Sequence, residues 1–123
     1  MDGDIRFGTL SIDCPDAALL CRFYAGLLHG RAVERYGCPA VVPPEGPVLL
    51  FMQEEDFVPC VWPEAPGEQQ KQIHFDFQVP DVPAAVARAE ALGAVKAPAQ
   101  FGGADFVTML DPAGHPFCLC RAD

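Results

Sequence analysis

The residues best suited to chemistry lie in the segment "QIHFDFQVPD", where polar and apolar side chains alternate from Gln72 to Val79. His74 and Asp76 fall on the polar side of this alternation, because successive side chains of a strand point to opposite faces. An imidazole can bind a metal or transfer a proton near neutral pH. Three interpretations of His74 follow: a metal ligand, an acid or base that works without metal, or a polar side chain on a wet strand.

Other motifs that carry catalysis are missing from the sequence. It has no Gly-x-Ser-x-Gly motif and no glycine-rich phosphate loop, which disfavours serine hydrolases and nucleotide-binding enzymes. Six cysteines are present, but none form a Cys-x-x-Cys pair, and the closest pair is Cys118 and Cys120. We expect free thiols that pack as small apolar side chains, with a reactive or metal-bound Cys118 as the alternative.

The charge of the chain limits its partners. It has 17 acidic and 8 basic residues, a net charge of -9. Nucleic acids and anionic membranes would repel such a surface, so we expect neither as a partner. No apolar run approaches the roughly 20 residues of a membrane span, and the start "MDGDIRF" lacks the features of a signal peptide. These features predict a cytoplasmic protein.

The elements that must position His74 belong to an internal repeat. "TLSIDCPD" and "HFDFQVPD" align at a constant offset of 65 residues, and each is followed by a helical pattern that closes near a glycine. These glycines, Gly30 and Gly93, can adopt the left-handed conformation that ends a helix. Asp16 and Asp81 are suited to cap these helices, since a carboxylate accepts hydrogen bonds from the open N–H groups of a first turn. Each half therefore begins with a strand and a capped helix.

The apolar residues of both helices follow the spacing of three and four that marks a buried face. They are Leu19, Leu20, Phe23, Leu27 and Leu28, then Val82, Ala85, Val86, Ala89 and Leu92. Strand alternation likewise assigns a set of residues to the core side of each sheet. This set is Leu10, Ile12, Phe75, Phe77, Val79, Phe117 and Leu119.

Three shorter apolar runs after each helix predict further strands: "AVERY", "PAVV" and "VLLFMQ", then "AVKAP", "FVTML" and "PFCLC". The sequence thus predicts an α+β fold with two βαβββ modules. We expect a single domain over residues 5–121, with module one at about 5–54, a linker rich in proline, glycine and charge at about 55–71, and module two at about 72–121.

The paired plan, together with "VPD", "FYAGLLHG", "IHFDF", "WP" and above all "DPAGHPFCL", resembles the vicinal oxygen chelate superfamily. This superfamily contains glyoxalase I, bleomycin-resistance proteins and extradiol dioxygenases, and the match looks like its small glyoxalase-like branch. The resemblance implies a curved mixed sheet around a cleft, a homodimer, and in catalytic members a divalent metal held by the first and last strands of each module.

Transferred position by position, the resemblance puts Thr9 and His74 on the first strands, Cys118 on the last strand of module two, and Phe51 or Gln53 on that of module one. Only His74 is a good ligand for a divalent metal. We therefore predict a degenerate metal site and no required cofactor. A divalent metal remains possible if Asp76 or Asp13 completes the site.

The remaining candidate residues would contact a ligand in the cleft. Trp62 offers a stacking surface for a planar molecule, or alternatively pins the linker to the sheet, and His115 closes a turn or lies at the cleft edge. The residues expected to bind substrate are Thr9, Asp13, Gln53, Trp62, Asp76 and Cys118, with His74 as a possible acid or base.

Three functions are compatible with these residues. The first is a glyoxalase-like protein with a small-molecule cleft, either a ligand binder or an enzyme of unassigned reaction. The second is a metal-dependent lyase, isomerase or dioxygenase that uses His74. The third is a drug-sequestering protein of the bleomycin-resistance type, since an acidic, aromatic cleft suits cationic or planar drugs.

Overall fold

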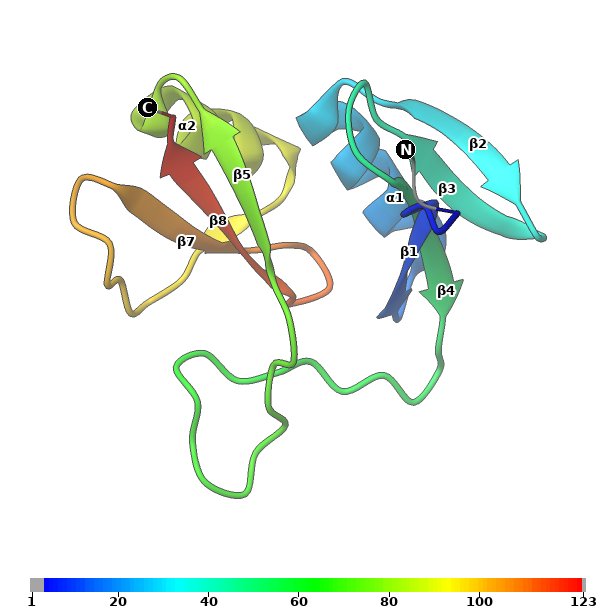
Figure 1. Cartoon of the computed structure of the whole chain (residues 1–123). Coiled ribbons are helices and arrows are strands. Elements are labelled where there is room, and N and C mark those ends of the chain that lie inside the picture. Colours follow the sequence, from blue (N-terminus) through cyan, green and yellow to red (C-terminus); the bar gives the residue numbers. More distant parts are fainter. Residues whose placement is uncertain (1–3, 123) are drawn as a thin grey trace. The chain divides into compact units, whose positions relative to one another are not determined.

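The chain forms two compact units in a computed structural model that describes residues 4–122 (Figure 1). The first unit ends at Phe57 and the second begins at Val58. Each unit has a four-stranded mixed sheet with one helix. The predicted pair of βαβββ modules is therefore confirmed.

The first unit contains β1 (Thr9–Cys14), α1 (Ala17–Leu28), β2 (Arg31–Arg35), β3 (Cys38–Val42) and β4 (Val48–Gln53). Its strand order is β1-β4-β3-β2, with β1 and β4 parallel and the other neighbours antiparallel. Helix α1 packs on β3 and β4, where the rings of Tyr24 and Phe51 are stacked with 5.9 Å between their centroids. Both rings are completely buried, so the core of this unit lies between the helix and the sheet.

The second unit repeats this plan with β5 (Phe75–Val79), α2 (Val82–Leu92), β6 (Val95–Lys96), β7 (Phe106–Leu110) and β8 (Pro116–Arg121). Its strand order is β5-β8-β7-β6, and β5 and β8 are the parallel pair. The predicted strands therefore form with ends that move by a residue or two. One shift matters for the site, because β5 starts at Phe75 and leaves His74 immediately before the strand.

Both helices begin as the sequence predicts. The Asp16 carboxylate accepts a hydrogen bond from the Leu19 N–H at 3.1 Å, and the Asp81 carboxylate accepts one from the Ala84 N–H at 3.0 Å. These bonds satisfy N–H groups that have no partner inside the helix. The repeated Pro-Asp pair therefore marks where each strand ends and its helix begins.

The helix ends differ from the prediction at one glycine. Gly93 ends α2 with φ 116°, as expected, but His29 rather than Gly30 takes the left-handed conformation after α1, with φ 54°. Gly30 is needed for space instead, since a Cβ there would lie 2.5 Å from Cγ1 of Val41. A close approach of the helix end to β3 therefore requires the glycine.

The predicted helix faces are partly wrong at their edges. Leu19 and Leu92 are exposed, because a five-residue stripe wraps further around each helix than the sheet covers. The contact of α1 with the sheet is made by Ala17, Leu20, Cys21, Phe23 and Tyr24. The core side of the strands is as predicted, since burial alternates along β1 and β5 and both Phe117 and Leu119 are buried.

No helix or strand lies between Gln53 and Phe75, the stretch that contains the predicted linker. Within residues 4–122, neither helix is long and apolar enough to cross a membrane.

Candidate functional site

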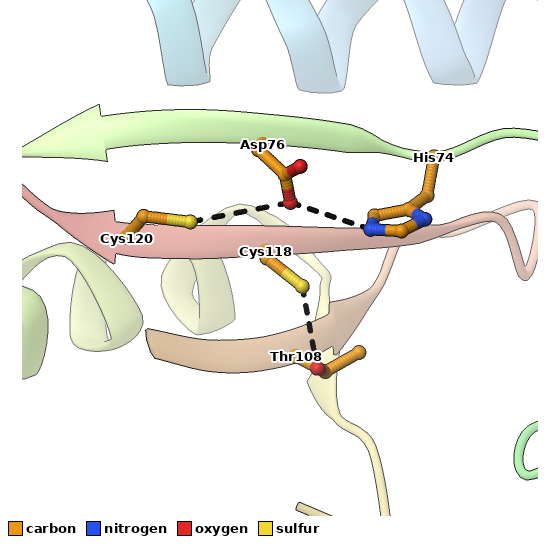
Figure 2. A network of polar contacts seen from close by, with 5 residues as sticks. All are labelled: His74, Asp76, Thr108, Cys118 and Cys120. Carbon is orange, nitrogen blue, oxygen red and sulfur yellow. Dashed lines mark hydrogen bonds and ion pairs between the residues drawn. The ribbon is translucent and has the colours of Figure 1, made fainter. Parts of the chain in front are cut away.

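Three side chains with different donor atoms converge on one face of the second sheet (Figure 2). They are His74 just before β5, Asp76 within β5 and Cys118 on β8, and we call them the donor cluster. One ligand atom from each residue lies within 4.8 Å of the other two. Thr108 on β7 and Cys120 on β8 flank the cluster.

Strand register brings these residues together. Asp76 is the direct partner of Cys118 in the parallel pair of β5 and β8, and Thr108 is the partner of Cys118 in the antiparallel pair of β7 and β8. Paired residues on neighbouring strands point to the same face, so three strands each contribute a polar side chain there. The alternation noted in "HFDFQV" therefore correctly put His74 and Asp76 on one side.

The cluster is linked by polar contacts. His74 Nε2 lies 3.3 Å from Asp76 Oδ1, and the same carboxylate oxygen accepts a long hydrogen bond of 4.0 Å from the Cys120 thiol. On the other side, Cys118 Sγ and Thr108 Oγ1 are 3.3 Å apart. The Asp76 carboxylate thus orients the imidazole, and the Thr108 hydroxyl orients the Cys118 thiol.

Exposure divides the cluster into an open part and a closed part. The side chains of His74 and Asp76 are 32% and 62% exposed, whereas Cys118 is only 4% exposed. Burial raises the pKa of the Cys118 thiol, the hydrogen bond from Thr108 opposes this rise, and the charge of Asp76 adds to it. Burial, followed by the charge of Asp76, also raises the pKa of Cys120. Both sulfurs are therefore held as thiols unless a cation displaces the proton.

The donor set fits a divalent cation of the zinc type. Imidazole nitrogen, thiolate sulfur and carboxylate oxygen are all zinc ligands, and a catalytic zinc site keeps three protein ligands and an open position. In a tetrahedral site with bonds of about 2.0 to 2.3 Å, ligand atoms lie roughly 3.3 to 3.8 Å apart. Small rotations of exposed His74 and Asp76 would bring the three atoms to that spacing. The register therefore provides the carboxylate that the sequence left open.

The first unit has no equivalent donor set among its described residues. Its register pairs Ser11 with Leu50, which corresponds to Asp76 paired with Cys118. Leu50 therefore holds the place for which the sequence suggested Phe51 or Gln53. Phe51 instead packs against α1, and Gln53 lies on the helix side, where its Oε1 accepts a hydrogen bond from the Ala17 N–H at 3.1 Å.

Thr9 and Asp13 are exposed on the sheet face of the first unit that points away from α1, as predicted. Thr9 lies beside Val48, and Asp13 lies beside Met52. The structure defines these positions within the first unit alone. Contact of Thr9, Asp13 or Gln53 with a ligand, and a cleft shared by both modules, stay predictions.

Trp62 anchors the linker to its own unit. The indole N–H donates a hydrogen bond to the Ala99 carbonyl at 3.0 Å, and the ring meets Phe101 edge-on with 6.0 Å between centroids. The ammonium of Lys71 lies over the ring, 4.9 Å from its centroid. One face of the indole is thus already covered by a cation, and stacking on a ligand stays a prediction.

Sequence reasoning missed the role of Asp111, which organises the turn "DPAGHP" before β8. Asp111 is 4% exposed, and its Oδ1 accepts hydrogen bonds from the N–H groups of Ala113 and His115 at 2.9 and 3.0 Å. The backbone of His115 closes the turn, because its carbonyl accepts from the Asp111 N–H at 2.9 Å. The sequence signal was available, since Asp before Pro-x-Gly marks such a turn.

All six cysteines are free thiols. Buried Cys21 donates a long hydrogen bond to the Ala40 carbonyl, and Cys38 lies 3.9 Å from Met52 Sδ. The sulfur of Cys118 lies within 4.8 Å of donor atoms of both His74 and Asp76, and the sulfur of Cys120 lies 4.0 Å from the Asp76 carboxylate. These two sulfurs therefore differ in surroundings from the thiols that pack in the cores.

Comparison with known families agrees with this architecture. The model of the family described as glyoxalase-like domain matches residues 9–120, which is nearly the whole chain. The chain belongs to the glyoxalase-like domain family. This membership is consistent with the vicinal oxygen chelate superfamily suggested by the sequence.

Solved structures show the same fold as this glyoxalase-like protein. A glyoxalase/bleomycin resistance protein/dioxygenase family enzyme from Burkholderia phytofirmans PsJN aligns with TM-score 0.68 and 18% identity, covering 95% of this chain and 98% of its own. TnmS3, an antibiotic binding protein from Streptomyces sp. CB03234, aligns with TM-score 0.64 and 16% identity, covering 99% and 100%. The trypanothione-dependent glyoxalase I of Leishmania major aligns with TM-score 0.64 and 17% identity, covering 96% and 87%. No curated protein matches the chain in sequence.

Proposed function

We propose that this glyoxalase-like protein binds a small molecule at the face of the second sheet that carries the donor cluster. The observation that supports this proposal is the convergence of an imidazole just before β5, a carboxylate on β5 and a thiol on β8, a strand distant from β5 in sequence. His74 and Asp76 are accessible to a ligand, while Cys118 lies buried behind them. Small-molecule sites have this form: a few convergent polar groups on a rigid scaffold.

The pair of His74 and Asp76 can also handle a proton. A carboxylate 3.3 Å from Nε2 holds the ring in one orientation, as the partner of a general acid or base does. A bound hydroxyl or carbonyl could then exchange a proton with the imidazole. The net charge of -9 favours ligands that carry positive charge. An antibiotic-sequestering role is the alternative suggested by the name of TnmS3.

A thermal-shift screen tests the proposal. Small molecules, including cationic and planar antibiotics, are screened with the wild type, and each hit is repeated with His74→Ala and Gln78→Ala. Gln78 is a matched control because it is exposed on the same face of β5 but lies outside the donor cluster. We expect hits that disappear in His74→Ala and persist in Gln78→Ala. Hits that His74→Ala retains unchanged would move the binding site elsewhere.

A second candidate function is favoured by the same donor set. His74, Asp76 and Cys118 would hold a divalent metal, which supplies Lewis-acid polarisation of a bound oxygen when present. The protein would then act as a lyase, isomerase or dioxygenase of its superfamily, with the cluster residues orienting the substrate. Elemental analysis of the wild type and His74→Ala after supply of zinc, nickel, iron and manganese tests this function. Equal metal content in both proteins would reject it.

The superfamily also leads us to propose a homodimer in the cytoplasm. Light scattering coupled to size-exclusion chromatography measures the mass directly, and a value near 13.2 kDa at all concentrations would reject the dimer.

A further inference from the structure

We infer that the donor cluster selects thiophilic cations, such as zinc and cadmium, over hard cations such as magnesium and manganese. The inference rests on the second candidate function, a metal bound at this cluster, and adds to it the class of ion. It follows from donor atoms that the sheet brings together on one face: a nitrogen, an oxygen and two sulfurs (Figure 2).

A hard cation would find few ligands here. Magnesium and manganese prefer six oxygens from carboxylates, carbonyls and water. Among the cluster and its flanking residues, Asp76 is the sole carboxylate, and the Thr108 hydroxyl is already engaged with the Cys118 sulfur at 3.3 Å. A magnesium ion would thus gain one strong protein ligand and would leave the imidazole and the thiols unused.

A soft or borderline cation would bind the imidazole and thiol groups that magnesium and manganese leave unused. Thiolate and imidazole are preferred ligands of zinc and cadmium, and carboxylate is an acceptable third ligand. The sulfur of Cys118 also faces the polar side chains of its strand partners Asp76 and Thr108. Buried cysteines elsewhere in the chain face backbone carbonyls, as Cys21 does with Ala40. The surroundings of Cys118 therefore suit a cation better than they suit an apolar contact.

Cys120 supplies a fourth donor at the edge of the cluster. It follows Cys118 by two residues on β8, so both side chains point to the same face. Its Sγ already lies 4.0 Å from Asp76 Oδ1, and it is half-buried, which leaves room for rotation. A cation drawn to Asp76 can therefore recruit the Cys120 sulfur and reach the four ligands of a tetrahedral site.

The experiment compares ions and variants by direct binding. Protein freed of metal with a chelator and kept reduced is titrated by calorimetry with zinc, cadmium, magnesium and manganese. Cobalt is then added as a spectroscopic probe, because thiolate bound to cobalt gives a charge-transfer absorption that oxygen and nitrogen ligands do not. We expect one zinc or cadmium per chain, no saturable binding of magnesium or manganese, and a thiolate band with cobalt.

Variants assign the donors. Losing an outer-shell partner of a metal ligand typically costs about 10- to 100-fold in affinity. We expect Cys118→Ser and His74→Ala to lose more zinc affinity than this. Cys118→Ser should also lose the cobalt band. Cys120→Ser should lose less zinc affinity than either of these variants. Cys38→Ser is the matched control, a half-buried thiol in the first unit that lies beside Met52, and it should bind as the wild type does.

The outcomes separate the inference from the function on which it rests. If magnesium or manganese binds as tightly as zinc and Cys118→Ser changes nothing, the metal site stands and the selectivity is refuted. If no ion binds at all, the metal-dependent function and the selectivity both fall, and the small-molecule proposal is judged by its own screen. Should Cys118→Ser fail to fold, the thiolate band of the wild type and its change in Cys120→Ser and His74→Ala decide the matter.

Discussion

The buried carboxylate of Asp111 should contribute strongly to the stability of the second unit. One oxygen of this side chain accepts the N–H groups of Ala113 and His115, and Asp111→Ala removes the acceptor for both. Ala113 is buried, so its N–H would be left without a partner, whereas the half-buried His115 N–H can turn to water. A buried N–H group without a partner carries the full desolvation penalty, because no hydrogen bond replaces the one that it makes with water in the unfolded chain.

The magnitude follows from these two bonds. A hydrogen bond to a charged group contributes about 1.5 to 3 kcal/mol, and water recovers part of the bond to His115. We therefore expect Asp111→Ala to lower the free energy of unfolding by about 2 to 4 kcal/mol. Asp111→Asn keeps one oxygen that can accept both bonds but loses the charge, so its loss should be about half as large.

Urea denaturation followed by tryptophan fluorescence reports on the unfolding of the second unit. Trp62 is the only tryptophan in the chain, and its indole N–H is hydrogen-bonded to the Ala99 carbonyl within that unit. With a slope of about 2 kcal/mol per molar urea, a loss of about 3 kcal/mol lowers the midpoint by about 1.5 M. Asp56→Ala, at an exposed carboxylate, is the control and should stay within about 0.5 kcal/mol of the wild type. A loss below about 1 kcal/mol for Asp111→Ala, or an equal loss for Asp111→Asn, would refute the reasoning.

Three further predictions concern backbone and thiol positions. Gly30→Ala should lose about 1 to 3 kcal/mol in urea denaturation followed by circular dichroism, because its Cβ would lie 2.5 Å from Val41, whereas Gly8→Ala meets open space and should change little. His29→Gly should raise the unfolding free energy by up to about 1 kcal/mol, since glycine adopts the observed φ of 54° without strain, and a loss by the same assay would contradict this. Burial raises the pKa of the Cys118 thiol, so the folded state keeps its proton better than the unfolded state, and stability should fall as pH rises above about 8.5. Cys118→Ala should make that alkaline decline shallower in denaturation curves taken from about pH 8 to about pH 10, and an unchanged slope would count against it.

The sequence predicted the fold well because its signals were local and occurred twice. The Pro-Asp pairs at Asp16 and Asp81 each satisfy their own helix, and strand alternation in "HFDFQV" depends on nothing outside the strand. A second copy of each signal confirmed the first. The errors fell where the neighbouring element decides, as at Gly30, whose role depends on the distance to Val41 in β3.

The candidate site was only partly predictable because register is not local. Alternation put Asp76 and Cys118 on the polar faces of two strands, but neither segment contains a pattern that predicts their direct pairing. For the same reason, the sequence could not decide whether Phe51 or Gln53 corresponds to Cys118 on the last strand of module one. The observed register puts Leu50 at that position. Pairing strands so far apart in sequence depends on how the whole unit packs, which local patterns do not encode.

The parallel pairing of β5 with β8 has a kinetic consequence. The Cys120 sulfur and the Asp76 oxygen that it contacts are 44 residues apart in sequence, and α2, β6 and β7 lie between them. Contacts across such separations form late, because the chain must close a long loop before it gains from them. A folding intermediate in which β8 has not yet docked would hold His74 and Asp76 close together but lack both sulfurs. The complete donor set therefore exists only in the fully folded unit. A cation or ligand that needs the sulfurs would bind only after β8 has docked beside β5.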